Sequence, residues 1–157
     1  MIMIGLMLSF NNQSNRGLMK SIERFDGEFD WLSNFFPCKV EFEGLTFDNS
    51  EAAFQAAKCL NPIERTKFVG LAAGKSKRLG KKVELRPDWN DIRIDVMRQV
   101  LKAKFGQNKD LAEKLVATGD VQITEMNGWG DSFWGVCRGK GQNHLGKLLM
   151  ELRDNLK

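Results

Sequence analysis

The 157-residue sequence contains no tyrosine and a single histidine, His144. Catalytic pairs of serine or cysteine with histidine, and zinc-binding HExxH helices, would all depend on that one residue. The cysteines, Cys38, Cys59 and Cys137, are odd in number and share no C-x-x-C spacing, which argues against a disulfide framework and a zinc site. We therefore expect chemistry that needs neither a metal nor another cofactor, with His144 on the surface or at a helix start.

Long apolar segments and glycine-rich phosphate loops are also absent. No segment approaches the roughly 18 to 20 consecutive apolar residues of a membrane-spanning helix, and the apolar run at residues 1–10 has neither a basic leader nor a cleavage site. Neither G-x-x-x-x-G-K-S/T nor a G-x-G-x-x-G after a strand occurs. These absences predict a cytoplasmic protein with no membrane partner and disfavour standard nucleoside-triphosphate chemistry.

The chain has two regions that differ in composition and periodicity. Residues 1–20 combine four methionines with a polar NNQSNRG stretch and show neither a helical nor a strand period. We expect a loosely ordered N-terminal extension over 1–20, with Met1 or Met19 as the natural start. Residues 21–157 are expected to form one domain, because this length supports a single hydrophobic core.

The periodicity of apolar residues predicts helices with a small sheet. Alternation from Cys38 to Phe47 around Glu43-Gly44 is typical of a β-hairpin, and short strands are expected at 21–25 and 121–124. Cap residues and helical spacing predict helices at 51–60, 61–73, 91–105, 109–117 and 143–156. Because alternating βαβ units are missing, the sequence predicts an α+β, predominantly helical domain with a small antiparallel sheet.

The net charge of +4 is unevenly distributed. Between Gly74 and Arg86 only Glu84 is acidic, and we expect this glycine-containing segment to be a loop. Its basic residues are Lys75, Lys77, Arg78, Lys81, Lys82 and Arg86. The segment is either a solvated basic surface or an edge that binds phosphate.

Two carboxylates occupy positions that suit catalysis. Glu51 opens an alanine-rich helix behind a polar turn, and Asp131 lies in the loop GWGDSFWG. Without a metal, paired acidic groups suit the cleavage of glycosidic bonds, in which they stabilise positive charge on the sugar or move protons. Structural roles also remain open, because Asp48-x-x-Glu51 is shaped like a helix capping box and aspartate often forms turns in glycine-rich loops.

Aromatic side chains gather in or beside the expected loops, where flat rings can stack on a purine or pyrimidine. They are Trp31, Trp89, Trp129, Trp134, Phe35, Phe36 and Phe133. For any one of them, and for Trp89 and Trp134 in particular, filling the core is the competing interpretation.

Several separate blocks resemble a known family. They are FDWLSNFFP at 29–37, SEAAFQAAK at 50–58, DWN at 88–90, DSFWGV at 131–136, GQNHLG at 141–146 and LMELR at 149–153. In order and spacing these blocks resemble the YbiA/NADAR family over roughly residues 25–156. No single block is specific, but the combination is.

This resemblance implies a compact, helix-rich α+β domain that hydrolyses N-glycosidic bonds. Members of the family are described as removing the base from ribosylamino-pyrimidine phosphates, which are intermediates of riboflavin synthesis. Relatives are described as removing ADP-ribose from modified guanine in nucleic acid. The implied substrate partner is a small ribosyl phosphate or an ADP-ribosylated nucleic acid, and the oligomeric state stays open.

The resemblance and the residue pattern together predict a set of site residues. The catalytic carboxylates are Glu51 and Asp131, with the division of roles between them left open. The substrate-binding residues are Asn34, Phe35, Trp89, Trp134, Gly135, Asn143, Lys75 and Arg78. A catalytically silent module that binds ADP-ribose or a nucleotide is the alternative function, and it would need the tryptophans and the basic segment but not both acids.

Overall fold

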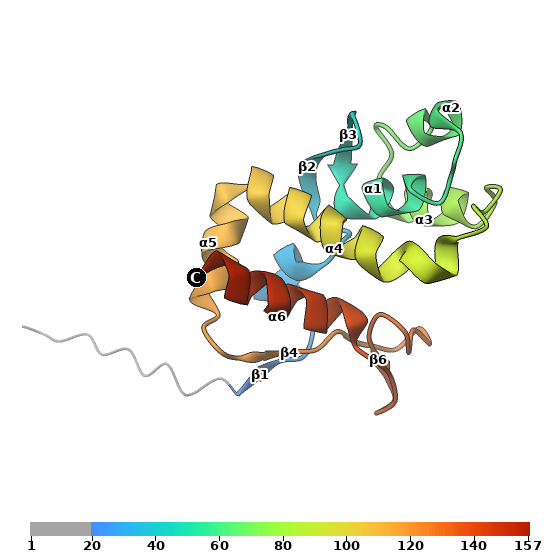
Figure 1. Ribbon diagram of the computed structural model, residues 1–157. Helices are drawn as coiled ribbons and strands as arrows, with labels where there is room; N and C mark the ends of the chain where they lie inside the picture. The colour runs from blue at the N-terminus through green and yellow to red at the C-terminus, as the bar shows by residue number, and fades with distance from the viewer. Residues whose placement is uncertain (1–19) are drawn as a thin grey trace, which may run out of the picture.

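A computed structural model describes residues 20–157, so the extension expected at 1–20 lies outside the described residues apart from Lys20 (Figure 1). The strands are β1 (Ser21–Ile22), β2 (Pro37–Phe42), β3 (Leu45–Asn49), β4 (Gln122–Ile123), β5 (Met126–Asn127) and β6 (Val136–Cys137). The helices are the 3-10 helix η1 (Gly27–Leu32), α1 (Ser50–Ala56), α2 (Pro62–Thr66), α3 (Ala73–Gly80), α4 (Trp89–Gln107), α5 (Lys109–Ala117) and α6 (His144–Leu156). Within the described range, no helix is long and apolar enough to cross a membrane.

The long helix α4 crosses the middle of the domain (Figure 1). It packs against the β2–β3 hairpin and α1 on one side and against α6 on the other. Met97, Val100, Leu101 and Phe105 lie on one face of α4, with Val100 and Leu101 three and four residues after Met97 and Phe105 four after Leu101. All four are buried and join side chains of α1 and α6 in one core. This architecture is the predominantly helical α+β domain that the sequence predicts.

The β2–β3 hairpin forms as expected. Val40 pairs with Phe47 in an antiparallel ladder, and both side chains are buried. Glu43 and Gly44 have positive φ values of 49° and 81°, which is the backbone conformation that a tight two-residue turn requires. The pairs β1–β4 and β5–β6 are parallel and only two residues long, so they tie distant segments together without adding to the hairpin.

Helix α1 lies in the middle of the core. The Asn49 side chain caps it, because Oδ1 accepts a hydrogen bond from the backbone N–H of Ala52 at 2.8 Å. Every residue of α1 is buried, and the helix contacts α3 and α4. The alanine-rich composition therefore reflects close helix packing. The helix ends at Ala56, earlier than the expected boundary at residue 60.

Helix α3 corrects the expectation of a loop at 74–86. Its buried residues are small, namely Ala73, Ser76 and Gly80, and they face α1. A Cβ atom at Gly80 would overlap Oε1 of Gln55, so a larger residue here would displace the Gln55 side chain. The basic segment is therefore helical in its first half, and the helix expected over 61–73 is limited to α2, which ends at Thr66.

Candidate active site

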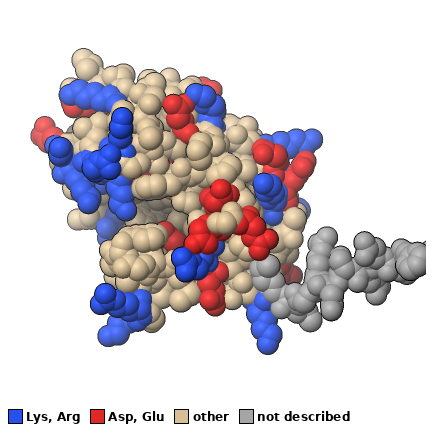
Figure 2. Space-filling model, turned by 180° about the vertical axis from the view of Figure 1, so that it is seen from behind, with Lys and Arg blue, Asp and Glu red and all other residues tan. Residues whose placement is uncertain are grey.

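A cavity of about 960 Å³ opens where α1, α3 and α4 meet the loop between η1 and β2 and the segments on both sides of β5. This volume suits a nucleotide-sized ligand. Aromatic rings and charged groups of both signs line it. Figure 2 shows a hollow on one face of the molecule, with Lys and Arg side chains gathered beside it.

The structure brings six of the ten expected site residues together in this cavity. Those six are Asn34, Phe35, Glu51, Trp89, Asp131 and Trp134. The others, Gly135, Asn143, Lys75 and Arg78, do not line it. Lys75 and Arg78 are exposed on α3, whereas Lys77, which lies between them in the sequence, is half-buried and lines the cavity.

Glu51 points into the cavity and does not cap its helix. Its Oε1 accepts a hydrogen bond from Nε2 of Gln55, one turn along α1, at 2.8 Å. Asn49 is the cap, and the carboxylate of Asp48 pairs with Lys39. The capping-box interpretation of Asp48-x-x-Glu51 is therefore wrong, and the Glu51 side chain is available for another role.

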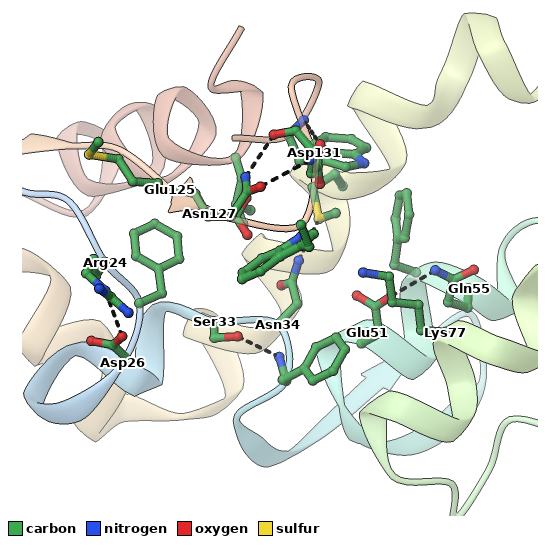
Figure 3. Close-up of a pocket in the computed structure, with 18 of the residues that line it drawn as sticks. Arg24, Asp26, Ser33, Asn34, Glu51, Gln55, Lys77, Glu125, Asn127 and Asp131 are labelled. Atoms are coloured by element: carbon green, nitrogen blue, oxygen red, sulfur yellow. Dashed lines mark hydrogen bonds and ion pairs between the residues drawn. The ribbon is translucent and has the colours of Figure 1, made fainter. Parts of the chain in front are cut away.

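The surroundings of Glu51 act on its charge in opposite directions. The side chain is 8% exposed, and burial raises its pKa. The hydrogen bond from Gln55 and the positive charges of Lys77 and Lys58 lower the pKa, whereas the charge of Asp131 raises it further. Figure 3 shows Lys77 beside Glu51. A buried carboxylate flanked by two lysines suits the stabilisation of a cationic sugar, because the lysines favour its ionised form.

Asp131 is held by its own loop. Its Oδ1 accepts hydrogen bonds from the backbone N–H groups of Phe133 and Trp134 at 3.1 and 2.9 Å. The Asn127 side chain bonds to both the backbone N–H and the carbonyl of Asp131 (Figure 3). The turn-forming role considered for Asp131 is thus present. It is compatible with a role in the site, because the turn places the side chain at the cavity wall.

Aromatic rings form another part of the wall. The ring of Phe54 lies 5.1 Å from that of Trp89 and 5.4 Å from that of Trp134, measured between centroids. Trp89 is only 6% exposed and belongs to the core, so the core-filling interpretation is correct for most of its surface. Trp89, Trp129 and Trp134 all line the cavity, whereas Trp31 packs against Phe105 elsewhere.

A buried lysine anchors the loop that carries Asn34 and Phe35. Nζ of Lys104 donates hydrogen bonds to the carbonyl oxygens of Trp31 and Ser33 at 2.7 and 2.9 Å. Lys104 is fully buried, and burial lowers its pKa to about 8. Asn34 is held from the other side, since its Oδ1 accepts a hydrogen bond from the Ser50 hydroxyl at 2.8 Å. The loop is therefore fixed against both α4 and α1.

Glu125 is a cavity residue that sequence reasoning missed. It follows β4, and its backbone N–H donates to Oδ1 of Asn143 at 3.0 Å. A Cβ atom at residue 135 would overlap the Glu125 carbonyl oxygen and lie 2.9 Å from Oε2, so Gly135 permits the close approach. Gly135 and Asn143 thus contact Glu125 from behind the cavity wall. Gly135 and Asn143 were predicted as site residues from the sequence, but nothing in the sequence shows that they contact Glu125.

His144 does not line the cavity. Nε2 of His144 lies 2.8 Å from Oε1 of Gln142, and its ring lies 4.6 Å from that of Phe133, outside the cavity lining. Across residues 20–157, no three His, Cys, Asp or Glu side chains are grouped in a way that could hold a metal ion. The titratable groups that face the cavity are carboxylates, lysines and arginines.

Fold and site define a small α+β domain with a cavity lined by carboxylates and aromatic rings. The model of the NADAR domain family matches residues 22–157, and the chain belongs to this family. It is 37% identical over 135 residues to a riboflavin biosynthesis protein of Vibrio vulnificus, covering 83% of this chain and 36% of that protein. It is also 37% identical over 131 residues to the N-glycosidase YbiA of Escherichia coli, covering 80% of each. The NMR structure of E. coli YbiA matches with a TM-score of 0.76 at 31% identity, over 88% of this chain and 89% of that one.

Proposed function

We propose that the protein is an N-glycosidase that hydrolyses the bond between C1′ of a ribose and a nitrogen of a heterocycle. The observation that supports this most is the meeting of Glu51 and Asp131, which are distant in the sequence, in one cavity walled by tryptophans. The name of the E. coli relative, an N-glycosidase, supports the same chemistry, and that of the Vibrio relative places it in riboflavin biosynthesis. A silent ADP-ribose-binding module would not need two carboxylates beside the ligand.

The two carboxylates have separate tasks in such a reaction. When the heterocycle departs, positive charge develops on the sugar, and a nearby carboxylate lowers the energy of that transition state. A second carboxylate removes a proton from the water that attacks C1′. Glu51 and Asp131 line the same cavity, and the charge of Asp131 raises the pKa of Glu51. This shared placement supports a role for both groups on one bound sugar.

The charged and aromatic lining supports a phosphorylated riboside as the substrate. We propose that Trp89 and Trp134 contact the heterocycle and that Lys77 and Lys58 bind the phosphate. Nζ of Lys77 lies 5.8 Å from the ring of Phe35, and Nζ of Lys58 lies 5.9 Å from that of Trp89, so each cation adjoins an aromatic wall. A ribosylamino-pyrimidine phosphate combines all of these groups in one small molecule.

An ADP-ribosylated base in nucleic acid is the second candidate substrate. The exposed positions of Lys75 and Arg78 on α3 favour it, because those side chains are placed for phosphates outside the cavity. If nucleic acid is the substrate, replacing both residues by methionine weakens the binding of an ADP-ribosylated oligonucleotide. The same double variant has no effect on a small riboside phosphate held inside the cavity. Chromatography of free base after incubation with each substrate separates the two candidates.

The central test replaces each acid by its amide. Glu51→Gln and Asp131→Asn keep the shape of the side chain and remove its charge, so turnover should fall on the order of 100-fold or more in each variant. Single-turnover release of the base and the melting temperature are measured on the same samples. Glu113→Gln, on the exposed face of α5, is the matched control. Normal turnover in both amide variants would show that neither carboxylate takes part in the reaction, and a wild type that binds a riboside but releases no base would favour the silent binding module.

A further inference from the structure

We infer that Glu125 is the general acid that protonates the departing heterocycle, an inference that rests on the N-glycosidase function proposed above. The side chain lines the cavity, yet its Oε2 is buried and forms no hydrogen bond with the described part of the protein. A buried carboxyl oxygen without a partner is costly. Because the Glu125 side chain lines the cavity, a nitrogen of a heterocycle bound there would supply a hydrogen-bond partner for its carboxyl group.

The backbone holds Glu125 rigidly in this position. Its N–H donates to Oδ1 of Asn143 at 3.0 Å, and its carbonyl accepts from the N–H of Val136 at 2.8 Å. Asn143 is fixed in turn, because its Nδ2 donates to the carbonyl of Ile123 at 2.9 Å. The close approach of Gly135 restricts the carboxyl group further. A proton donor needs such fixed geometry, because proton transfer requires hydrogen-bond distance to the leaving nitrogen.

The charges around Glu125 favour its protonated form. Burial raises its pKa to about 7, the charges of Asp131 and Glu51 raise it as well, and that of Lys77 lowers it. The other charged side chains that line the cavity are Glu23, Arg24, Asp26, Lys58 and Arg93. Burial and the charge of Asp131 also raise the pKa of Glu51, but two lysines and the amide of Gln55 oppose that rise, whereas Lys77 alone opposes it at Glu125. Of the two glutamates, Glu125 therefore has the surroundings that better suit a proton donor.

The proposed step balances in atoms and electrons. The bond from C1′ to nitrogen breaks, its electron pair goes to the heterocycle, and the nitrogen takes the proton of Glu125. Water then adds to C1′ and gives up one proton, first to Asp131 or Glu51 and finally to Glu125, which restores the starting state. One water is consumed, the free base and the ribose product leave, and no oxidant or metal takes part.

The experiment compares wild-type protein, Glu125→Gln and the control Glu113→Gln on the riboside that the wild type hydrolyses. Turnover of Glu125→Gln should fall about 100-fold to 10,000-fold, the range typical of a lost general acid. Wild-type turnover should decline as the pH rises through about 7, because the acid must carry its proton, and this decline should be missing in Glu125→Gln. A merely structural role would leave the shape of the pH profile unchanged.

A second measurement does not depend on activity or on the folding of a variant. NMR titration of the Glu125 carboxyl in the wild-type protein should show a midpoint near pH 7. A midpoint at the ordinary value of 4.5, or turnover of Glu125→Gln within about threefold of wild type, would overturn the inference. If the wild type hydrolyses a riboside and Glu125→Gln hydrolyses it at a normal rate, the proposed function stands but Glu125 is not its general acid. If the wild type releases no base from any riboside, the proposed function fails and the inference fails with it.

Discussion

Replacing Lys104 by methionine removes one buried charge while keeping a long apolar side chain of similar volume. The lysine is fully buried on α4 and donates hydrogen bonds to the carbonyls of Trp31 and Ser33. The variant therefore separates two effects, which are the cost of burying the ammonium group and the benefit of anchoring the loop that carries Asn34.

The magnitude follows from the lowered pKa of Lys104. Burial shifts this pKa from 10.5 to about 8, and one pKa unit corresponds to about 1.4 kcal/mol. Holding the proton in the folded state thus costs about 3 kcal/mol relative to the unfolded chain. Methionine removes this cost but leaves two carbonyls unpaired, at about 1 to 3 kcal/mol each. Near neutral pH we therefore expect the variant to lie between about 1 kcal/mol more stable and about 3 kcal/mol less stable than the wild type.

The pH dependence is the sharper part of this prediction. Between about pH 8 and 10.5 the unfolded chain still binds the proton that the folded chain has lost, so the free energy of unfolding of the wild type rises with pH. The methionine variant lacks this titration. Denaturant unfolding of both proteins across this window should show the wild type gaining about 3 kcal/mol on the variant. Lys102 is an exposed lysine on the same helix, so Lys102→Met is the control. The wild type should show no such gain relative to this control variant. A difference between wild type and Lys104→Met that stays constant with pH would refute the reasoning.

Two further predictions concern Gly135 and the N-terminal extension. Gly135→Ala should lower turnover at least about tenfold and destabilise the fold by about 1 to 3 kcal/mol, because the new Cβ overlaps the Glu125 carbonyl oxygen. Turnover and unfolding assays measure both effects. Gly106→Ala is the control, because a Cβ atom at residue 106 meets no neighbour within 4 Å. Normal turnover in Gly135→Ala would contradict the supporting role of this glycine. A chain that starts at Met19 should unfold cooperatively and turn over like the full chain, because residues 1–20 have no amphipathic period and the family match begins at residue 22. A loss of solubility or activity in the shortened chain would show that the extension completes the domain.

Elements with a clear pattern of apolar residues along the chain were predicted correctly. The alternation around Glu43-Gly44 and the apolar spacing on α4 each describe a face that is buried in the structure, so both elements were predicted correctly. Helix α3 was not predicted, because its buried face consists of Ala73, Ser76 and Gly80 and carries no apolar stripe. Without that helix, the sequence could not show that Lys77 faces the cavity while Lys75 and Arg78 face solvent.

The same limit explains what was missed in the candidate site. Lys104 looks like a surface lysine in the sequence, and only the packing of α4 against the loop after η1 buries it. Glu125 follows a two-residue strand and belongs to no motif, so its place depends on contacts with residues 135 and 143. Glu51 and Asp131 were singled out because each lies beside a pattern that is visible locally, a helix start and a tryptophan-flanked glycine loop.

The positions of the four tryptophans make the intrinsic fluorescence of this protein sensitive to the cavity. Since the chain has no tyrosine, its near-ultraviolet emission arises from four tryptophans, and Trp89, Trp129 and Trp134 all line the cavity. Trp129 is 65% exposed, whereas Trp31 is buried against Phe105 away from the ligand and acts as an internal reference. On the proposed function, a heterocycle that enters the cavity should change the emission of these three tryptophans. Binding of a riboside and release of its base would then be followed in real time on the unlabelled protein.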